Sequence, residues 1–282
     1  MSAQRLDVAL AAAGLARSRT HARRIIEEGR ARVDDLSVTR PSAPVPAGSS
    51  LTVVDIPDGV EFASRAAHKL ISALDTLGID PSGLRCVDAG ASTGGFSDVL
   101  LRRGAAHISA VDIGHDQLAS HVREDPRVTV HDGISVRVLT PELLGGPADL
   151  LVADLSFISL RTVIAALGGV VRDDGELLVM VKPQFEVGRA ALPRTGVVTD
   201  PEQHIRAVRE VARAAAGEGL VTLAVGASGL TGQDGNREYF LHLRRTGVTC
   251  ALEVPACDMI ESAVRGAVPH GRHPRGDHTG KG

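Results

Sequence analysis

The sequence contains almost no lysine, although its basic residues are otherwise plentiful. Only three of the 31 lysine and arginine residues are lysines. An ammonium group can lose its proton, whereas a guanidinium group effectively cannot. We therefore interpret Lys69 and Lys182 as candidates for proton chemistry. Chance in an arginine-biased composition is the alternative, and it fits Lys281 better than the other two lysines.

Cysteines and long apolar runs are also scarce. The three cysteines, Cys86, Cys250 and Cys257, have neither the even number of a disulfide framework nor the spacing of metal ligands. We expect no metal site and a reducing compartment. The sequence has no run of about 18 apolar residues and no signal-type segment. These absences predict a cytoplasmic protein without a membrane span.

Length and charge pattern predict two domains of unequal size. A chain of 282 residues can form one α/β domain and one small appendage. We expect the appendage at residues 1–59, a linker at 60–63, the main domain at 64–267 and a disordered basic tail at 268–282. Residues 1–40 contain eight arginines against five acidic residues, and the tail is also net positive. Basic ends on an acidic body indicate contact with a polyanion.

The amino-terminal segment has the pattern of a small nucleic-acid-binding module. Helices are predicted at 5–13 and 18–29, followed by strands near 31–35 and 51–54. Arginines crowd these helices, where a helix pair can follow a phosphate backbone. A solvated helical face is the alternative interpretation. The arginines that we assign to RNA binding are Arg5, Arg17, Arg19, Arg23, Arg24 and Arg30.

The stretch from Cys86 to Phe96 is the most informative part of the chain. A short apolar strand leads into an acidic residue, a glycine-rich turn and a helix, which is the pattern of a ligand-binding turn at the edge of a parallel sheet. The dinucleotide motif Gly-x-Gly-x-x-Gly is absent, and an acidic strand end suits a cationic ligand. We therefore predict S-adenosylmethionine, which carries an ammonium and a sulfonium. A turn that uses glycine for geometry alone is the alternative. The predicted binding residues here are Asp88, Gly90, Ala91, Ser92, Thr93, Gly94, Gly95 and Phe96.

Acidic residues also end three later strands of the predicted parallel sheet. Asp112, Asp132 and Asp154 close strands at 107–112, 127–132 and 149–154. Asp112 lies 22 positions after Gly90, a separation that suits hydrogen bonds to ribose hydroxyls. Asp132 is predicted to face the adenine amino group. Helix capping by each of these residues is the alternative.

Four charged side chains are predicted to meet at the same sheet edge. Lys69 lies near the start of a helix at 64–77, and Lys182 ends an apolar strand at 176–183. The connection between the strands at 221–225 and 239–243 is too short for a crossover helix, so this pair is expected to be antiparallel and to bring Glu238 to that edge. Together with Asp154, these residues suit methyl transfer to a ribose 2′-hydroxyl. We assign Lys182 as the proton acceptor. A structural ion-pair network is the alternative.

The order of motifs closely resembles the TlyA family of ribosomal RNA 2′-O-methyltransferases, whose members are also called haemolysins. The resemblance covers nearly the whole chain apart from the tail. It departs from many members at Ala66-Ala67 and from some at Glu61-Phe62-Ala63. Besides a module similar to the S4-type αL RNA-binding fold at about residues 5–55, the matching stretches are Ser64 to Leu70, Asp88 to Phe96, Ala153 to Ser159, Lys182 to Glu186 and Asn236 to Phe240.

This resemblance implies an α/β fold: a Rossmann-like methyltransferase sheet with an antiparallel last strand, plus an S4-type domain. It also implies an FtsJ-like Lys-Asp-Lys-Glu tetrad and cytidine 2′-O-methylation of 16S and sometimes 23S ribosomal RNA. Two alternatives stay open: a membrane-active haemolysin, and a nonenzymatic RNA-binding or ribosome assembly factor. The sequence does not define the oligomeric state, and we expect a monomer.

Overall fold

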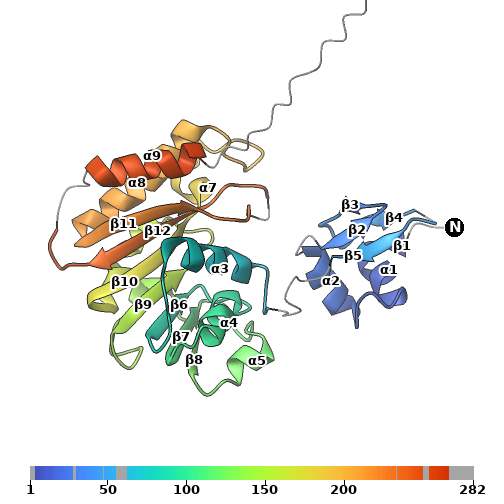
Figure 1. Cartoon of the computed structure of the whole chain (residues 1–282), viewed down its shortest axis with the longest axis horizontal. Helices are drawn as coiled ribbons and strands as arrows, with labels where there is room; N and C mark the ends of the chain where they lie inside the picture. Colours follow the sequence, from blue (N-terminus) through green and yellow to red (C-terminus); the bar gives the residue numbers. More distant parts are fainter. Residues whose placement is uncertain are drawn as a thin grey trace, which may run out of the picture.

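The computed structural model of the chain (Figure 1) describes residues 4–27, 30–46, 48–54, 62–232, 234–249 and 254–266. The predicted hinge at 55–59, the first half of the linker at 60–63 and the basic tail at 268–282 lie outside the described residues. Among the described residues, no helix has both the length and the apolar character needed to cross a membrane.

Residues 4–54 form the small module. Two helices pack on each other and on short antiparallel strands, because both helices place apolar residues on one face: Leu6 and Leu10 on the first, Ile25 and Ile26 on the second. Ser18 caps the second helix as predicted, accepting the His21 N–H at 3.1 Å. The elements are β1 (Gln4–Arg5), α1 (Leu6–Ala12), α2 (Arg19–Glu27), β2 (Ala31–Val33), β3 (Leu36–Ser37), β4 (Pro44–Val45) and β5 (Leu51–Val53).

A seven-stranded sheet forms the centre of the main domain (Figure 1). The strand order is β11-β12-β10-β9-β6-β7-β8, and β12 alone runs antiparallel to its neighbours. This confirms the predicted parallel sheet with an antiparallel last strand. The strands are β6 (Arg85–Ala89), β7 (His107–Asp112), β8 (Val128–Asp132), β9 (Ala148–Ala153), β10 (Val171–Val181), β11 (Leu220–Ala227) and β12 (Tyr239–Arg245).

Helices cover both faces of this sheet. Alternate residues of β9 pack into two different hydrophobic clusters. Leu150 and Val152 join the cluster under α3 and α4, whereas Leu151 and Ala153 join the cluster under α8 and α9. A strand buried on both faces therefore reads as a continuous apolar run. The helices are α3 (Ala66–Leu77), α4 (Gly95–Arg102), α5 (Ser120–Arg123), α6 (Ile164–Gly169), α7 (Pro183–Glu186), α8 (Pro201–Gly217) and α9 (Val254–Gly266), with short 3₁₀ turns at Val136–Val138 and Leu160–Thr162.

The structure adds three features to the predicted elements. Strand β10 begins at Val171, well before the predicted residue 176, and α7 forms one helical turn directly after Lys182. Helix α9 was not predicted. Helix α8 has a local start signal, since the Asp200 side chain accepts the Glu202 N–H and Pro201 occupies the first turn.

Candidate active site

A cavity of about 680 Å³ opens at the carboxyl edge of the sheet. The ends of β6, β9 and β10 and the residues before β12 all reach it, which is the position expected for a ligand site in an open α/β sheet. All four of the predicted charged residues line it. They are Lys69, Asp154, Lys182 and Glu238.

Lys69 and Glu238 form a buried ion pair on one side of the cavity. The Lys69 Nζ lies 2.5 Å from the Glu238 Oε2, and both side chains are less than a tenth exposed. The Met180 sulfur also lies near Nζ, at 3.9 Å. Glu238 reaches this place because β12 runs antiparallel to β10, as the short connection predicted. Two buried charges need each other here, since either one alone would be strongly unfavourable.

Asp154 and Lys182 form a second ion pair. Asp154 follows β9 and Lys182 follows β10, and these two strands are parallel neighbours, so both side chains leave the sheet at the same edge. The Lys182 Nζ lies 2.6 Å from the Asp154 Oδ1 and donates to the Ser156 Oγ at 3.0 Å. The cavity therefore presents two ammonium groups, each neutralised by its own carboxylate.

The glycine-rich turn lies beside these pairs. The N–H groups of Gly90 and Ala91 both donate to the Val111 carbonyl, which fixes the turn to β7. Gly90 has a φ of +87°, and a Cβ there would lie 3.0 Å from the Asp154 carbonyl oxygen. Glycine is thus required both by the backbone angle and by the close approach of the Asp154 loop. The turn residues that line the cavity are Gly90, Ala91, Ser92, Thr93, Gly95 and Phe96.

Asp88 lies beneath this turn and is completely buried. Its Oδ2 accepts a hydrogen bond from the Ser97 hydroxyl at 2.7 Å, while its Oδ1 has no partner among the described residues. Burial raises the pKa of Asp88 to about 7, against the opposing effect of the hydrogen bonds from Ser97. The carboxyl group is therefore poised to change its charge near neutral pH.

The two remaining predicted acids lie at the ends of β7 and β8. Asp112 accepts the Ser92 N–H at 2.8 Å and the Gly114 N–H at 2.7 Å, so it links the glycine turn to the following loop. Asp132 accepts from the Asp116 N–H and from Arg123. Four of the predicted donor-binding residues are not among the described residues that line the cavity: Asp88, Gly94, Asp112 and Asp132.

Comparison with known proteins places this architecture in a family. The S4 domain pattern matches residues 4–51, and the FtsJ-like methyltransferase pattern matches residues 62–245. The 16S/23S rRNA (cytidine-2′-O)-methyltransferase TlyA of Mycobacterium tuberculosis is 48% identical, over 95% of this chain and 98% of its own. The chain belongs to the TlyA family.

Other TlyA-family relatives carry a different name. Hemolysin A of Brachyspira hyodysenteriae is 29% identical over 84% of this chain and 98% of its own. A solved structure from Streptococcus thermophilus, provisionally described as a hemolysin, superposes with a TM-score of 0.73 at 30% identity. It covers 94% of this chain and 96% of its own. Both the fold and the domain order are therefore shared along the chain.

The predicted RNA-binding arginines of the module have different surroundings. Arg23 and Arg24, on α2, line the active-site cavity. Arg5 and Arg19 instead contact the buried Asp7, whose carboxylate lies 2.9 and 3.3 Å away. Hydrogen bonding by Arg5 lowers the pKa of Asp7 to about 2. These two guanidinium groups are still half-exposed or more, so they can hold the module together and also face solvent.

Of the other two arginines, Arg17 is exposed and Arg30 is half-buried. Arg30 donates to the Val54 carbonyl at 2.9 Å, across the small sheet. The Arg17 N–H donates to the His21 ring at 3.0 Å, just before α2. Their assignment to RNA binding stays a prediction.

Sequence reasoning missed two aromatic residues at this TlyA-family cavity. Phe157 is 92% exposed and has a φ of +62°, a conformation that a bulky residue rarely adopts. Its ring lies 5.2 Å from that of Phe185, and both residues line the cavity. An apolar residue is ordinarily expected to be buried in the core, so the sequence gives no sign that the Phe157 side chain faces solvent. The left-handed conformation is visible only in the structure.

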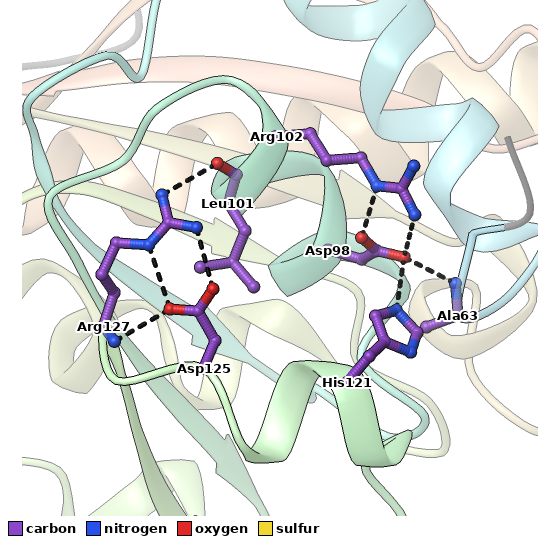
Figure 2. Close-up of polar contacts among 7 residues, drawn as sticks. All are labelled: Ala63, Asp98, Leu101, Arg102, His121, Asp125 and Arg127. Atoms are coloured by element: carbon purple, nitrogen blue, oxygen red, sulfur yellow. Dashed lines mark hydrogen bonds and ion pairs between the residues drawn. The ribbon is translucent and has the colours of Figure 1, made fainter.

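Asp98, on α4, fixes the beginning of the methyltransferase domain (Figure 2). Its carboxylate accepts the Ala63 N–H at 2.8 Å and Arg102 Nε at 2.6 Å, and lies 3.0 Å from His121 Nε2. Burial alone would raise the pKa of Asp98, but hydrogen bonds from Arg102 and His121 hold it below its ordinary value. The Arg102 guanidinium also lies over the Phe62 ring, at 4.5 Å.

A second cluster in the same view holds the chain after α5. Arg127 forms a two-point contact with Asp125 and donates to the Leu101 carbonyl at the end of α4 (Figure 2). These contacts attach the segment between α5 and β8 to α4, which begins in the glycine turn. The segment before β8 is thus held to the helix that follows the glycine turn by residues that are not among those lining the cavity.

Proposed function

We propose that the chain transfers a methyl group from S-adenosylmethionine to the 2′-hydroxyl of cytidine in 16S and 23S ribosomal RNA. The observation that carries this proposal is the cavity with two lysine–carboxylate pairs beside a glycine-rich turn. It occurs in a chain that is 48% identical to a protein named for that reaction. Ribosomal RNA as substrate also supports a cytoplasmic location.

The residues around the turn fit the proposed donor. The glycine at position 90 lets the turn pack closely against the Asp154 loop at the cavity wall. Acidic groups at Asp88, beneath the turn, and at Asp112 complement the charge of a cationic ligand. Ile113, directly after Asp112, is 73% exposed and offers an apolar surface for adenine. We assign donor binding to Asp88, Gly90 to Phe96, Asp112 and Asp132. When bound, S-adenosylmethionine supplies a methyl group on a positively charged sulfur.

The proposed reaction joins the ribose 2′-oxygen to the methyl carbon. The carbon–sulfur bond breaks as the carbon–oxygen bond forms, and its electron pair stays on sulfur. The hydroxyl proton passes to the Nζ of Lys182 after this ammonium group has released one proton to solvent, because only the neutral amine has a free electron pair. Much of the acceleration comes from holding the oxygen in line with the methyl group.

The other three residues of the tetrad hold this arrangement. Asp154 fixes the Lys182 Nζ at 2.6 Å, and Glu238 fixes the Lys69 Nζ at 2.5 Å. The Lys69 ammonium can donate a hydrogen bond to the 2′-oxygen and stabilise the negative charge that develops there. Each lysine therefore has a distinct role, one as proton acceptor and one as hydrogen-bond donor.

The RNA is held by the module and by the rim of the cavity. Arginines of the module neutralise phosphates, and Arg23 and Arg24 extend this positive surface to the cavity itself. A base moved out of its stack needs a new stacking partner, and the exposed Phe157 beside Phe185 provides one. The module therefore supplies affinity, while the cavity selects an unstacked nucleotide.

Ribose-methylation mapping tests the proposed function. Ribosomal RNA from cells with and without the gene is compared position by position, and cells carrying a Lys182→Ala variant serve as control. We expect 2′-O-methylcytidine at one or more sites only with the intact gene. Identical maps in all three strains would refute the proposal.

The alternative activities have direct tests as well. Some relatives are named hemolysins, and dye release from liposomes with the purified protein examines that activity. A nonenzymatic RNA-binding factor would not bind the methyl donor. Calorimetric titration with S-adenosylmethionine separates it from an enzyme, and we expect saturable binding at one site per chain.

A further inference from the structure

Ser156 lies in the active-site cavity, two residues after Asp154. Its hydroxyl oxygen accepts a hydrogen bond from the Lys182 Nζ at 3.0 Å, and the same nitrogen lies 2.6 Å from Asp154. Ser156 is exposed on the cavity wall, so its side chain does not serve as core packing. Among the described residues, its one side-chain hydrogen bond is to the residue that we assign as proton acceptor.

The tetrahedral geometry of the Lys182 Nζ determines how the contact with Ser156 orients the amine. Besides its bond to Cε, Nζ has three tetrahedral positions. Ser156 occupies one of them with a hydrogen bond, and this is the only hydrogen bond of Nζ within the part of the chain that the structure describes. The Asp154 Oδ1 lies 2.6 Å away as a charge partner, but it is not aligned for a hydrogen bond. In the neutral amine the position facing Ser156 holds a hydrogen, because the hydroxyl oxygen accepts it, and the negative charge of Asp154 repels the free electron pair. The electron pair is therefore directed to the position that faces neither oxygen.

The backbone around Ser156 is held on both sides. Leu155, before it, is buried and would contact any Cβ placed on Gly90, at 3.0 Å. Phe157, after it, has the left-handed φ of +62°. The Asp154 N–H donates to the Ala89 carbonyl, which attaches this segment to β6. The hydroxyl is thus presented to Lys182 from a constrained segment.

We propose that Ser156 is a positioning residue that, together with Asp154, directs the free electron pair of the Lys182 Nζ toward the ribose hydroxyl. This role rests on the proposed function. Removing the hydroxyl leaves the amine free to turn about its Cε–Nζ bond. Proton transfer then becomes slower, although the charges of the cavity do not change.

The test measures single-turnover methyl transfer to purified ribosomal subunits. We expect Ser156→Ala to lower the rate about ten- to a hundredfold, the range for loss of one hydrogen bond to a charged or reacting group. Ser156→Thr keeps a hydroxyl and should recover most of the rate. Affinity for S-adenosylmethionine and the unfolding temperature should be unchanged. Ser135→Ala, outside the cavity, is the matched control.

The pH profile distinguishes positioning from an effect on the charge of Lys182. In a positioning role, Ser156→Ala is slower than the wild type by the same factor at every pH. A wild-type rate in Ser156→Ala, or a defect that disappears at high pH, would overturn the inference. If the wild-type chain is inactive as well, both this inference and the proposed function fail. An active wild type with an unaffected variant removes only the role of Ser156.

Discussion

The two lysines of the cavity have different roles in the proposed chemistry, since Lys182 accepts a proton and Lys69 donates a hydrogen bond. Arginine substitution distinguishes the two roles. Lys182→Arg keeps the positive charge beside Asp154, but guanidinium stays protonated at any working pH. We expect single-turnover methyl transfer to fall about 10²–10⁴-fold, the usual effect of losing a general base. Binding of donor and RNA should survive, and calorimetry and filter binding check this.

Lys69→Arg serves as the comparison for that variant. The Lys69 position mainly supplies a positive charge and a hydrogen-bond donor next to Glu238, and guanidinium supplies both. The rate should therefore fall less than in Lys182→Arg, although the larger group must fit a buried site. A Lys182→Arg enzyme with a near-normal rate would leave Lys182 as a positioning cation and not a proton acceptor.

Asp88 should make the free enzyme less stable as the pH rises. In the unfolded chain its carboxyl group ionises near the ordinary value of 3.8, whereas in the folded chain its pKa is about 7. Between these values the folded state holds a proton that the unfolded state has released, so the free energy of unfolding decreases with pH. The loss amounts to a few kcal/mol and is complete above about pH 7.

Asp88→Asn removes this titration and keeps an oxygen that can accept from Ser97. Thermal unfolding at pH 5 and pH 8 should show the variant gaining stability over the wild type at the higher pH. Asp173→Asn is the control, because the Asp173 side chain is 88% exposed. A stability difference that does not change with pH would mean that Asp88 is already ionised in the folded protein. Weaker donor binding by the same variant would support its assigned role in the site.

At the scale of elements, Asp112 links the end of β7 to the glycine turn. It accepts one N–H from each side, from Ser92 and Gly114. Asp112→Ala removes these bonds together with the predicted bond to the donor ribose. We expect binding of S-adenosylmethionine to weaken by about 1.5–3 kcal/mol. Calorimetry measures it, with Asp173→Ala as a control at a distant exposed carboxylate, and unchanged affinity would show that the ribose binds elsewhere.

The elements that position the cavity could be predicted because their signals are local or topological. Short stretches of sequence contain three kinds of signal. They are apolar runs for strands buried on both faces, capping residues such as Ser18 and Asp200 at helix starts, and glycines at helix ends. Parallel strands then bring their carboxyl ends together without further information. The place of Glu238 followed from one topological step, the antiparallel β12, and the structure confirms that strand direction.

The features that were missed depend on tertiary contacts. Helix α9 packs on α8 and β11. Asp98 binds Ala63 and His121, 35 and 23 positions away in the chain. The partner of each tetrad lysine also needed the structure, since convergence of four charges does not say which pairs form. The exposure of Phe157 could not be predicted for the same reason, because it depends on how the folded chain places this residue.

At the scale of the whole molecule, the two domains have separate cores. One cluster is built only from residues between Leu6 and Val53, and the other two only from residues between Phe62 and Val264. Each domain therefore buries its own apolar surface. This independence predicts that RNA recognition and donor binding can be separated experimentally.

Deletion of residues 1–59 should leave donor binding intact and abolish methylation of folded ribosomal RNA. The cores of the methyltransferase domain keep every buried residue, so the truncated protein should fold and bind S-adenosylmethionine as the full chain does. It loses the arginines of the module and, with them, affinity for the subunit. Calorimetry and methyl incorporation measure the two properties. Full activity of the truncated protein on intact subunits would contradict this division of labour.

The double variant Arg23→Ala, Arg24→Ala tests how the module and the cavity act together. Both residues lie on α2 and line the cavity that holds Lys182, so they can contact phosphates next to the target nucleotide. Each phosphate contact releases counterions, and losing one flattens the plot of log affinity against log salt by roughly one unit of slope. We therefore expect a flatter slope and weaker RNA binding at low salt, with unchanged donor affinity. Arg172→Ala is the control, because Arg172 pairs with Asp149 and is not among the described residues that line the cavity. An unchanged slope would place the phosphate contacts on other arginines and leave Arg23 and Arg24 as part of the cavity wall.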